Sequence, residues 1–174
     1  MKSTGITRRI DDLGRIVIPK EIRKNLKIKE NEILEIFIDN DNIILKKFSS
    51  FDDMDKILEN YVNVLNDITL NNVLITDRDK VIMCSESKKY DYLNKNIGPN
   101  IQEVIDNKRE YISKEHKQFE IIDNISINTN YYIKPIINNG DILGTITLFG
   151  NRPIEEKDII ATNIISKLIV NYID

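Results

Sequence analysis

The stretch "DDLGRIVIPKEIRKNL", residues 11–26, passes from a turn through a strand into a basic helix. Gly14 closes the turn, because glycine adopts a positive φ without steric cost. The β-branched run at residues 16–18 predicts a strand. It stops at Pro19, which has no amide proton and suits a strand end or the first turn of a helix. One or two helical turns are then predicted over residues 20–26, and the stretch places four cations in a chain whose net charge is −3.

The pattern around this stretch predicts a small unit of paired strands and one helix. Strands are expected at residues 6–10, 15–18, 32–39 and 43–48, with the helix between the second and the third. About fifty residues bury little apolar surface, and domains of this size often rely on metals, disulfides or oligomerisation. The whole chain has one Cys and one His, which leaves little material for a disulfide or a zinc site. Residues 1–50 are therefore expected to fold as part of a dimer.

Positive charge is concentrated at this end of the chain. Residues 1–48 hold 11 Lys and Arg against 8 Asp and Glu, whereas the remainder holds 14 against 20. On the predicted helix, Ile22 and Leu26 share the face expected to dock on the strands, and the cations share the opposite side. Such a cluster either faces solvent only or binds a polyanion, and arginine suits both phosphate contacts and bidentate recognition of guanine. The candidate DNA-binding residues are Arg8, Arg9, Arg15, Lys20, Arg23 and Lys24.

The segment "STGITRRIDDLGRIVIPKEIR" closely resembles the DNA-binding domain of the AbrB family of bacterial transition-state regulators, and the match covers residues 1–48. The resemblance implies a swapped-hairpin β-barrel, in which two chains interleave their hairpins into one dimeric core, and it implies binding to double-stranded promoter DNA. Family contact positions fall on Arg8, Arg15, Arg23 and Lys24. Relatives usually carry Arg at the last of these, and Lys keeps the charge but loses the bidentate fork. Residues 1–50 are thus expected to be an AbrB-like DNA-binding domain.

Residues 51–174 predict a second domain of α+β type. A helix to about residue 70, a strand hairpin, a polar helical region, further antiparallel strands and a terminal helix follow one another. The segments "VLITDRDKVIMCSES" and "YYIKPIINNGDILGTITLFG" resemble a GAF-type domain. The resemblance implies either a small-molecule site on one face of the sheet or a platform for oligomerisation. No residue marks a particular ligand, so a sensor and a purely structural domain both remain open.

The first and last helices of this second domain carry apolar stripes. The first has apolar side chains at 4-3-4-3 spacing, which is typical of a heptad seam or of a buried amphipathic helix. The stripes are wider than one sheet face requires, which predicts contact with a second dimer and a homotetramer. The expected oligomer-interface residues are Met54, Leu58, Tyr61, Leu65, Ile68, Ile164 and Leu168.

The function expected from the sequence is transcription regulation. The whole chain resembles those AbrB-family members that regulate late gene expression in the developing spore, which implies an activator and repressor acting in the forespore. An AbrB-like antitoxin and a non-sensing architectural DNA-binding protein are the alternatives. Antitoxins usually carry a short disordered tail, and a strongly patterned module of about 120 residues argues against that alternative.

Enzymes, metal proteins and membrane proteins are disfavoured. No set of nucleophile, base and orienting group is recognisable, and His116 lies among charged residues where solvation is expected. Cys84 lies in a predicted strand as a small core or pocket residue. Asp77 and Asp79 flank a predicted turn, where Asp is common, so neither a metal site nor a cofactor is expected. No apolar run is long enough to span a membrane and no signal peptide is recognisable, so the protein is expected to be cytoplasmic.

Overall fold

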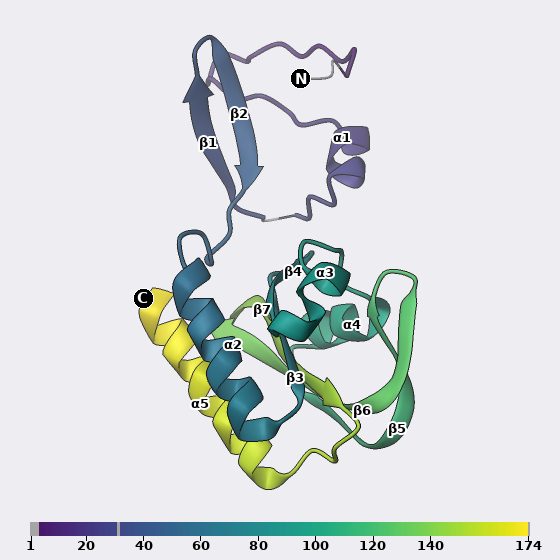
Figure 1. The fold of residues 1–174 in the computed structure, drawn as a ribbon. Coiled ribbons are helices and arrows are strands. Elements are labelled where there is room, and N and C mark those ends of the chain that lie inside the picture. Colours follow the sequence, from purple (N-terminus) through teal and green to yellow (C-terminus); the bar gives the residue numbers. More distant parts are fainter. Residues whose placement is uncertain (1–3, 31, 174) are drawn as a thin grey trace. The chain divides into compact units, whose positions relative to one another are not determined.

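The computed structural model describes residues 4–30 and 32–173 of the 174-residue chain. The chain divides into two units, Met1–Phe48 and Ser49–Asp174 (Figure 1). The first unit holds one short helix and one β-hairpin, and the second holds a sheet covered by helices. The two units therefore differ in kind as well as in size.

The helix and the hairpin of the first unit lie where the sequence predicts them. α1 spans Lys20–Asn25 and begins after Pro19, whose φ of −57° suits a helix start. β1 (Leu34–Asp39) and β2 (Asn42–Lys47) pair antiparallel, and Asn40 adopts a φ of 52° in the turn between them. These three elements begin and end within two residues of their expected limits.

The two earlier predicted strands, residues 6–10 and 15–18, are not strands in the single chain. A strand depends on the hydrogen bonds that it exchanges with a neighbour, and within the described part of this unit only β1 and β2 pair. The swapped-hairpin barrel requires strands from a second chain. One chain by itself therefore shows the hairpin alone, and the barrel stays a prediction.

Apolar side chains of the first unit are largely exposed. The exposed fraction is 81% for Ile38, 72% for Val17 and 72% for Ile43. Of the described residues up to Phe48, only Pro19 is buried. A two-stranded sheet leaves both of its faces open and is marginal by itself in water. The unit consequently lacks a core of its own.

The second unit is built on a five-stranded sheet whose neighbouring strands all run antiparallel. The strand order is β4-β3-β7-β6-β5. The β6–β7 hairpin turns through Asn139 and Gly140, which both have positive φ, as a two-residue hairpin turn of this type requires. The strands are β3 (Asn72–Thr76), β4 (Val81–Cys84), β5 (Tyr111–Ile122), β6 (Ile125–Asn138) and β7 (Asp141–Gly150).

Helices cover both faces of this sheet (Figure 1). α2 (Asp55–Thr69) and α5 (Glu156–Ile173) lie side by side on one face and share a core cluster with β3, β6 and β7. On the other face, η1 (Glu86–Lys88), α3 (Lys89–Tyr92) and α4 (Pro99–Asn107) accompany a second cluster. The result is the α+β architecture that the sequence predicts. No helix in the described ranges combines the length and apolarity needed to cross a membrane.

Part of the predicted oligomer interface lies inside the second unit. Met54, Leu58 and Leu65 are 3%, 1% and 0% exposed, because they belong to the core that α2 shares with α5 and the sheet. Tyr61 is half-buried against the same core. The expectation that the first three contact a second chain is therefore wrong: the heptad-like spacing reflects an amphipathic helix that covers its own sheet.

The outward side of the same two helices remains apolar. The predicted interface residues Ile68, Ile164 and Leu168 are exposed by 48%, 54% and 40%. Further exposed apolar side chains accompany them on both helices. We name this surface the outer helix face, and it consists of Val64, Ile68, Ile160, Ile164, Leu168 and Tyr172.

Candidate nucleic-acid interface and ligand groove

The turn before the basic helix is organised by one carboxylate. Asp11 Oδ1 accepts hydrogen bonds from the amides of Leu13 (3.1 Å) and Arg15 (2.7 Å), and Asp11 Oδ2 accepts one from Arg15 Nε (2.8 Å). The bond from the Arg15 amide is the main cause that holds the pKa of Asp11 below its usual value. The Arg15 side chain remains 69% exposed. Asp11 thus restrains an arginine at the surface without covering it.

Five of the six candidate DNA-binding residues are exposed. Two precede the Asp11 turn, one lies in it, and two lie one helical turn apart on α1. Exposed cations at this density attract a polyanion such as the phosphate backbone of DNA. The five are Arg8, Arg9, Arg15, Lys20 and Lys24.

Arg23 is less exposed than the other five candidates. It is half-buried, and its Nε is buried without a hydrogen-bond partner among the described residues. Leu26, expected to dock on the strands, is 57% exposed. A buried donor without a partner costs free energy, and so does an exposed leucine that is not packed. Both observations indicate that the surface around α1 is incomplete in a single chain.

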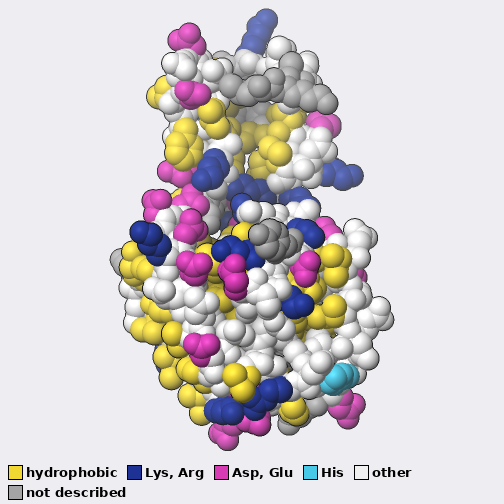
Figure 2. Space-filling view, in the orientation of Figure 1, with side chains coloured by type: hydrophobic (Ala, Val, Ile, Leu, Met, Phe, Trp, Pro, Cys, Tyr) yellow, Lys and Arg dark blue, Asp and Glu magenta, His cyan; other side chains and the backbone are white. Residues whose placement is uncertain are grey.

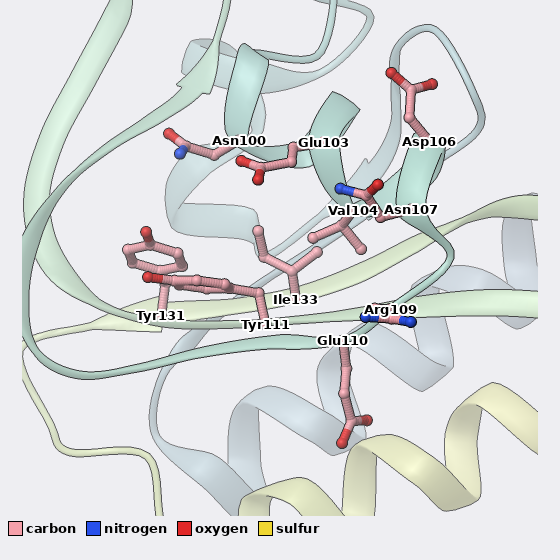
Figure 3. A pocket seen from close by; sticks show the side chains of 10 residues that line it. All are labelled: Asn100, Glu103, Val104, Asp106, Asn107, Arg109, Glu110, Tyr111, Tyr131 and Ile133. Carbon is pink, nitrogen blue, oxygen red and sulfur yellow. The ribbon is translucent and has the colours of Figure 1, made fainter.

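The second unit carries an open groove of about 670 Å³ between α4 and strands β5 and β6 (Figure 3). Tyr111 stacks on Tyr131 with ring centroids 5.5 Å apart, and Tyr131 stacks on Phe119 at 4.2 Å. Burial is the main cause that raises the pKa of Tyr131 to about 12, and Tyr111 and the charge of Glu103 add to it. Arg109 lines the same groove. Sequence reasoning missed these residues, because the groove depends on how α4 packs against β5 and β6, which the sequence pattern does not specify.

Glu110 connects the start of β5 to β6 at the edge of the groove. Its Oε2 accepts hydrogen bonds from the Tyr132 hydroxyl and from Lys134 Nζ, both at 2.9 Å. The bond from Lys134 is the main cause that lowers the pKa of Glu110. Tyr132 is 1% exposed and belongs to the core that α2 and α5 cover. Glu110 therefore joins the groove rim to the opposite side of the sheet.

Residues that suggested other chemistry lie in ordinary structural positions. Cys84 is buried at the end of β4, and burial raises the pKa of its thiol to about 11. Asp77 Oδ1 accepts hydrogen bonds from the amides of Asp79 and Lys80 at 2.7 Å and so closes the β3–β4 turn. His116 is exposed on β5. Across the described residues, no group of three His, Cys, Asp or Glu side chains is placed to hold a metal ion.

Comparison with known proteins assigns the chain to a family. Residues 53–169 match the family described as stage V sporulation protein T C-terminal, transcription factor. Stage V sporulation protein T of Bacillus subtilis (strain 168) is 43% identical over 151 residues, which cover 86% of this chain and 85% of that protein. The chain belongs to the stage V sporulation protein T family. The aligned length exceeds that of either unit, so the relationship runs through both.

The first unit of this stage V sporulation protein T family member has a second set of relatives. The transition state regulatory protein AbrB of Bacillus subtilis (strain 168) is 58% identical over 48 residues, which are 28% of this chain and 50% of that protein. Residues 7–51 also match the family described as antidote-toxin recognition MazE, bacterial antitoxin. The AbrB relationship inferred from the sequence is thereby confirmed, and the chain is a DNA-binding transcription regulator by descent.

The second unit has the GAF-like fold that the sequence predicts. A solved GAF domain/HD domain protein from Geobacter sulfurreducens is 13% identical and superposes with a TM-score of 0.54. The superposition covers 74% of this chain and 98% of that one. At this identity the likeness concerns the fold alone.

Glu110→Gln is expected to lower the stability of the second unit at neutral pH and to do so less in acid. Lys134 stabilises the ionised carboxylate, so the pKa of Glu110 is lower in the folded chain than its ordinary 4.5. Such a group contributes stability above the unfolded pKa and loses it as the pH falls through the folded pKa. Urea unfolding followed by tyrosine fluorescence measures the effect, because all seven tyrosines lie in the second unit.

Glu115→Gln is the matched control, since it removes an exposed carboxylate from β5, the strand that Glu110 immediately precedes. It should leave the pH dependence of unfolding unchanged. Parallel pH profiles for wild type and Glu110→Gln would show that the Glu110–Lys134 pair contributes nothing to stability.

Proposed function

We propose that this chain binds double-stranded promoter DNA as a dimer of its first unit and regulates late sporulation genes, activating some and repressing others. Its second unit assembles the oligomer and binds a small molecule. The protein then acts on DNA in the cytoplasm of the forespore. The observation that carries the proposal is the group of exposed cations around α1, in the unit that is 58% identical to AbrB.

The restrained Arg15 suits recognition of base edges or phosphates. Its guanidinium is positioned by Asp11 Oδ2 before any ligand arrives, so less conformational entropy is lost on binding. Lys20 and Lys24 on α1 are point charges suited to phosphate contacts. Arginine at the surface can read guanine bidentately, which gives a sequence preference in addition to affinity. The proposed contacts are Arg8, Arg9, Arg15, Lys20, Arg23 and Lys24.

Dimerisation is supported by the apolar face of the β1–β2 hairpin. Ile36 pairs with Leu45 and Ile38 pairs with Ile43 across the strands, so one face is wholly apolar at these positions. All four side chains are exposed in the single chain. A second copy could cover this face and supply neighbours for residues 6–10 and 15–18. The swapped-hairpin barrel is the arrangement that we propose.

A homotetramer is supported by the outer helix face. Figure 2 shows hydrophobic side chains gathered on the side of the second unit that α2 and α5 form. Exposed apolar patches rimmed by polar residues mark association sites. Two dimers joined here would hold two DNA-binding barrels together, and linking two sites raises avidity without new base contacts.

The antitoxin and architectural alternatives are less well supported. The MazE match is confined to residues 7–51, whereas the relationship to stage V sporulation protein T spans both units. The second unit has its own two core clusters and is not a disordered tail. The groove beside α4, with charged side chains at its rim, favours a ligand-binding role over a purely architectural one.

Arg8→Ala and Arg15→Ala are each expected to weaken promoter binding about tenfold or more without unfolding the protein. Each lost phosphate contact should also flatten the plot of log K against log salt by about 0.9. Anisotropy titrations of an AT-rich promoter duplex at several salt concentrations measure both quantities. Arg152→Ala removes the same charge from the second unit and should change neither. Wild-type affinity and slope in the two first-unit variants would refute the proposed DNA surface.

Ile38→Asp is expected to abolish both dimer formation and DNA binding. In a single chain the position is 81% exposed, so an aspartate there would cost little. In the barrel the same carboxylate would be buried without a partner, which is costly. Light scattering and a DNA titration on the full chain test this. Asn40→Asp adds the same charge in the β1–β2 turn and serves as the control. A dimer that persists in Ile38→Asp would exclude the interleaved hairpin.

Ile68→Glu and Ile164→Glu are expected to convert a tetramer into dimers. Both positions lie on the outer helix face, whereas the control Asn63→Glu adds the same charge to an exposed position elsewhere on α2. Binding to a duplex with one site should be unchanged, and binding to a duplex with two sites should weaken by about 100-fold through lost avidity. A wild-type protein that light scattering finds to be a simple dimer would rule out the tetramer.

A further inference from the structure

The groove beside α4 contains one carboxylate and one guanidinium that do not form an ion pair with each other. Four charged side chains line it: Glu103, Asp106, Arg109 and Glu110. Asp106 Oδ1 accepts a hydrogen bond from Gln102 Nε2 at 2.9 Å, and Glu110 is taken by Lys134. Neither Glu103 nor Arg109 makes an ion pair or a hydrogen bond with any residue that the structure describes. One carboxylate and one guanidinium are therefore left for a ligand.

The carboxylate stands next to an aromatic surface. In Figure 3, Glu103 points from α4 toward the two tyrosine rings, whereas Glu110 points away from them. Tyr111 is the outer ring of the stack and is 41% exposed, while Tyr131 beneath it is 3% exposed. A π face beside a carboxylate attracts a cation, and an organic ammonium satisfies both groups at once. This part of the groove is suited to an amine.

The other part of the groove is suited to a carboxylate. The guanidinium of Arg109 offers parallel N–H donors that match the two oxygens of a carboxylate. Val104 and Ile133, at 5% and 0% exposed, form the floor of the same groove, and the apolar surface open to a ligand is mainly that of Tyr111. An apolar or aromatic group can pack against this ring. Amine, carboxylate and apolar group together describe an amino acid.

We propose that this groove binds a free amino acid with an apolar or aromatic side chain. Its ammonium lies beside Glu103, its carboxylate lies on Arg109, and its side chain packs against Tyr111 above the floor that Val104 and Ile133 form. The inference rests on the proposed function that the second unit binds a small molecule, and it names the class of that molecule. A ligand with a single charge leaves Glu103 or Arg109 unpaired, whereas a zwitterion satisfies both.

The groove also adjoins a connection through the sheet. Arg109 precedes Glu110, which holds the Tyr132 hydroxyl at 2.9 Å. Tyr132 belongs to the core beneath α2 and α5. A carboxylate bound on Arg109 therefore restrains the segment that anchors this core. Residues 109–110 therefore connect the groove to the core beneath α2 and α5.

Calorimetric titration of the full chain with the common amino acids, one at a time, tests the ligand class. L-Phenylalanine is compared with phenethylamine, which keeps only the ammonium, and with phenylpropionic acid, which keeps only the carboxylate. We expect at least one apolar or aromatic amino acid to bind, and both single-charge analogues of L-phenylalanine to bind at least about tenfold more weakly than it does. Absence of binding by every amino acid at millimolar concentration overturns the proposal. Equal binding of phenethylamine overturns it in favour of a simple cation site.

Variants then locate the site. Glu103→Gln and Arg109→Gln should each weaken amino-acid binding about tenfold or more. Glu115→Gln and Lys108→Gln are the matched controls, because both residues lie outside the groove lining, Glu115 exposed on β5 and Lys108 with its Nζ donating to the Gly140 carbonyl. Both controls should bind as wild type does. Unchanged binding in Glu103→Gln and Arg109→Gln overturns the assignment to this groove.

The DNA titration of the same protein without amino acid separates this inference from the proposed function. If the protein binds promoter DNA but no amino acid, the proposed regulatory function stands and the proposed ligand class is refuted. If it binds the amino acid through Glu103 and Arg109 but does not bind DNA, the ligand site stands and the proposed regulatory function is refuted.

Discussion

The apolar face of the β1–β2 hairpin is left open by the described residues of its own unit. Ile36, Ile38, Ile43 and Leu45 all lie exposed, and the first unit contains almost no buried residue. A chain pays conformational entropy for every ordered residue, and without burial that cost is not recovered. The same lack of neighbours accounts for two further observations. Residues 6–10 and 15–18 form no strand, and the Nε of Arg23 is buried without a hydrogen-bond partner among the described residues. In the dimer that we propose, a second copy would satisfy all three, and the proposed DNA binding would then depend on assembly.

The second unit has the opposite character. Its sheet is covered on both faces, and two separate core clusters bury most of its large apolar side chains. The apolar side chains of the outer helix face lie outside both clusters and remain exposed. They are the surface on which we propose that two dimers associate.

The charged side chains also differ between the two units. The first unit leaves cations exposed, and Asp11 orients Arg15 among them. The second unit pairs Lys134 with Glu110 and leaves Glu103 and Arg109 in the groove. Glu110 reaches the hydroxyl of Tyr132 in the core on the other side of the sheet. The start of β5 therefore links the groove to the core beneath α2 and α5.

Local chemistry in the sequence was enough to place α1 and the β1–β2 hairpin and to indicate the family. Pro19 after a β-branched run marks the start of α1, and the cations around α1 together with the AbrB resemblance indicate DNA binding. Only the tertiary structure decided which surfaces meet. Leu65 and Ile68 both belong to the same apolar spacing on α2, yet one is buried and the other is half exposed. Glu103, Arg109 and Tyr131 share a groove because α4 packs against the β5–β6 hairpin that follows it. The reason is physical: spacing along a chain sets the periodicity of an element, whereas burial and the pairing of charges depend on what that element packs against.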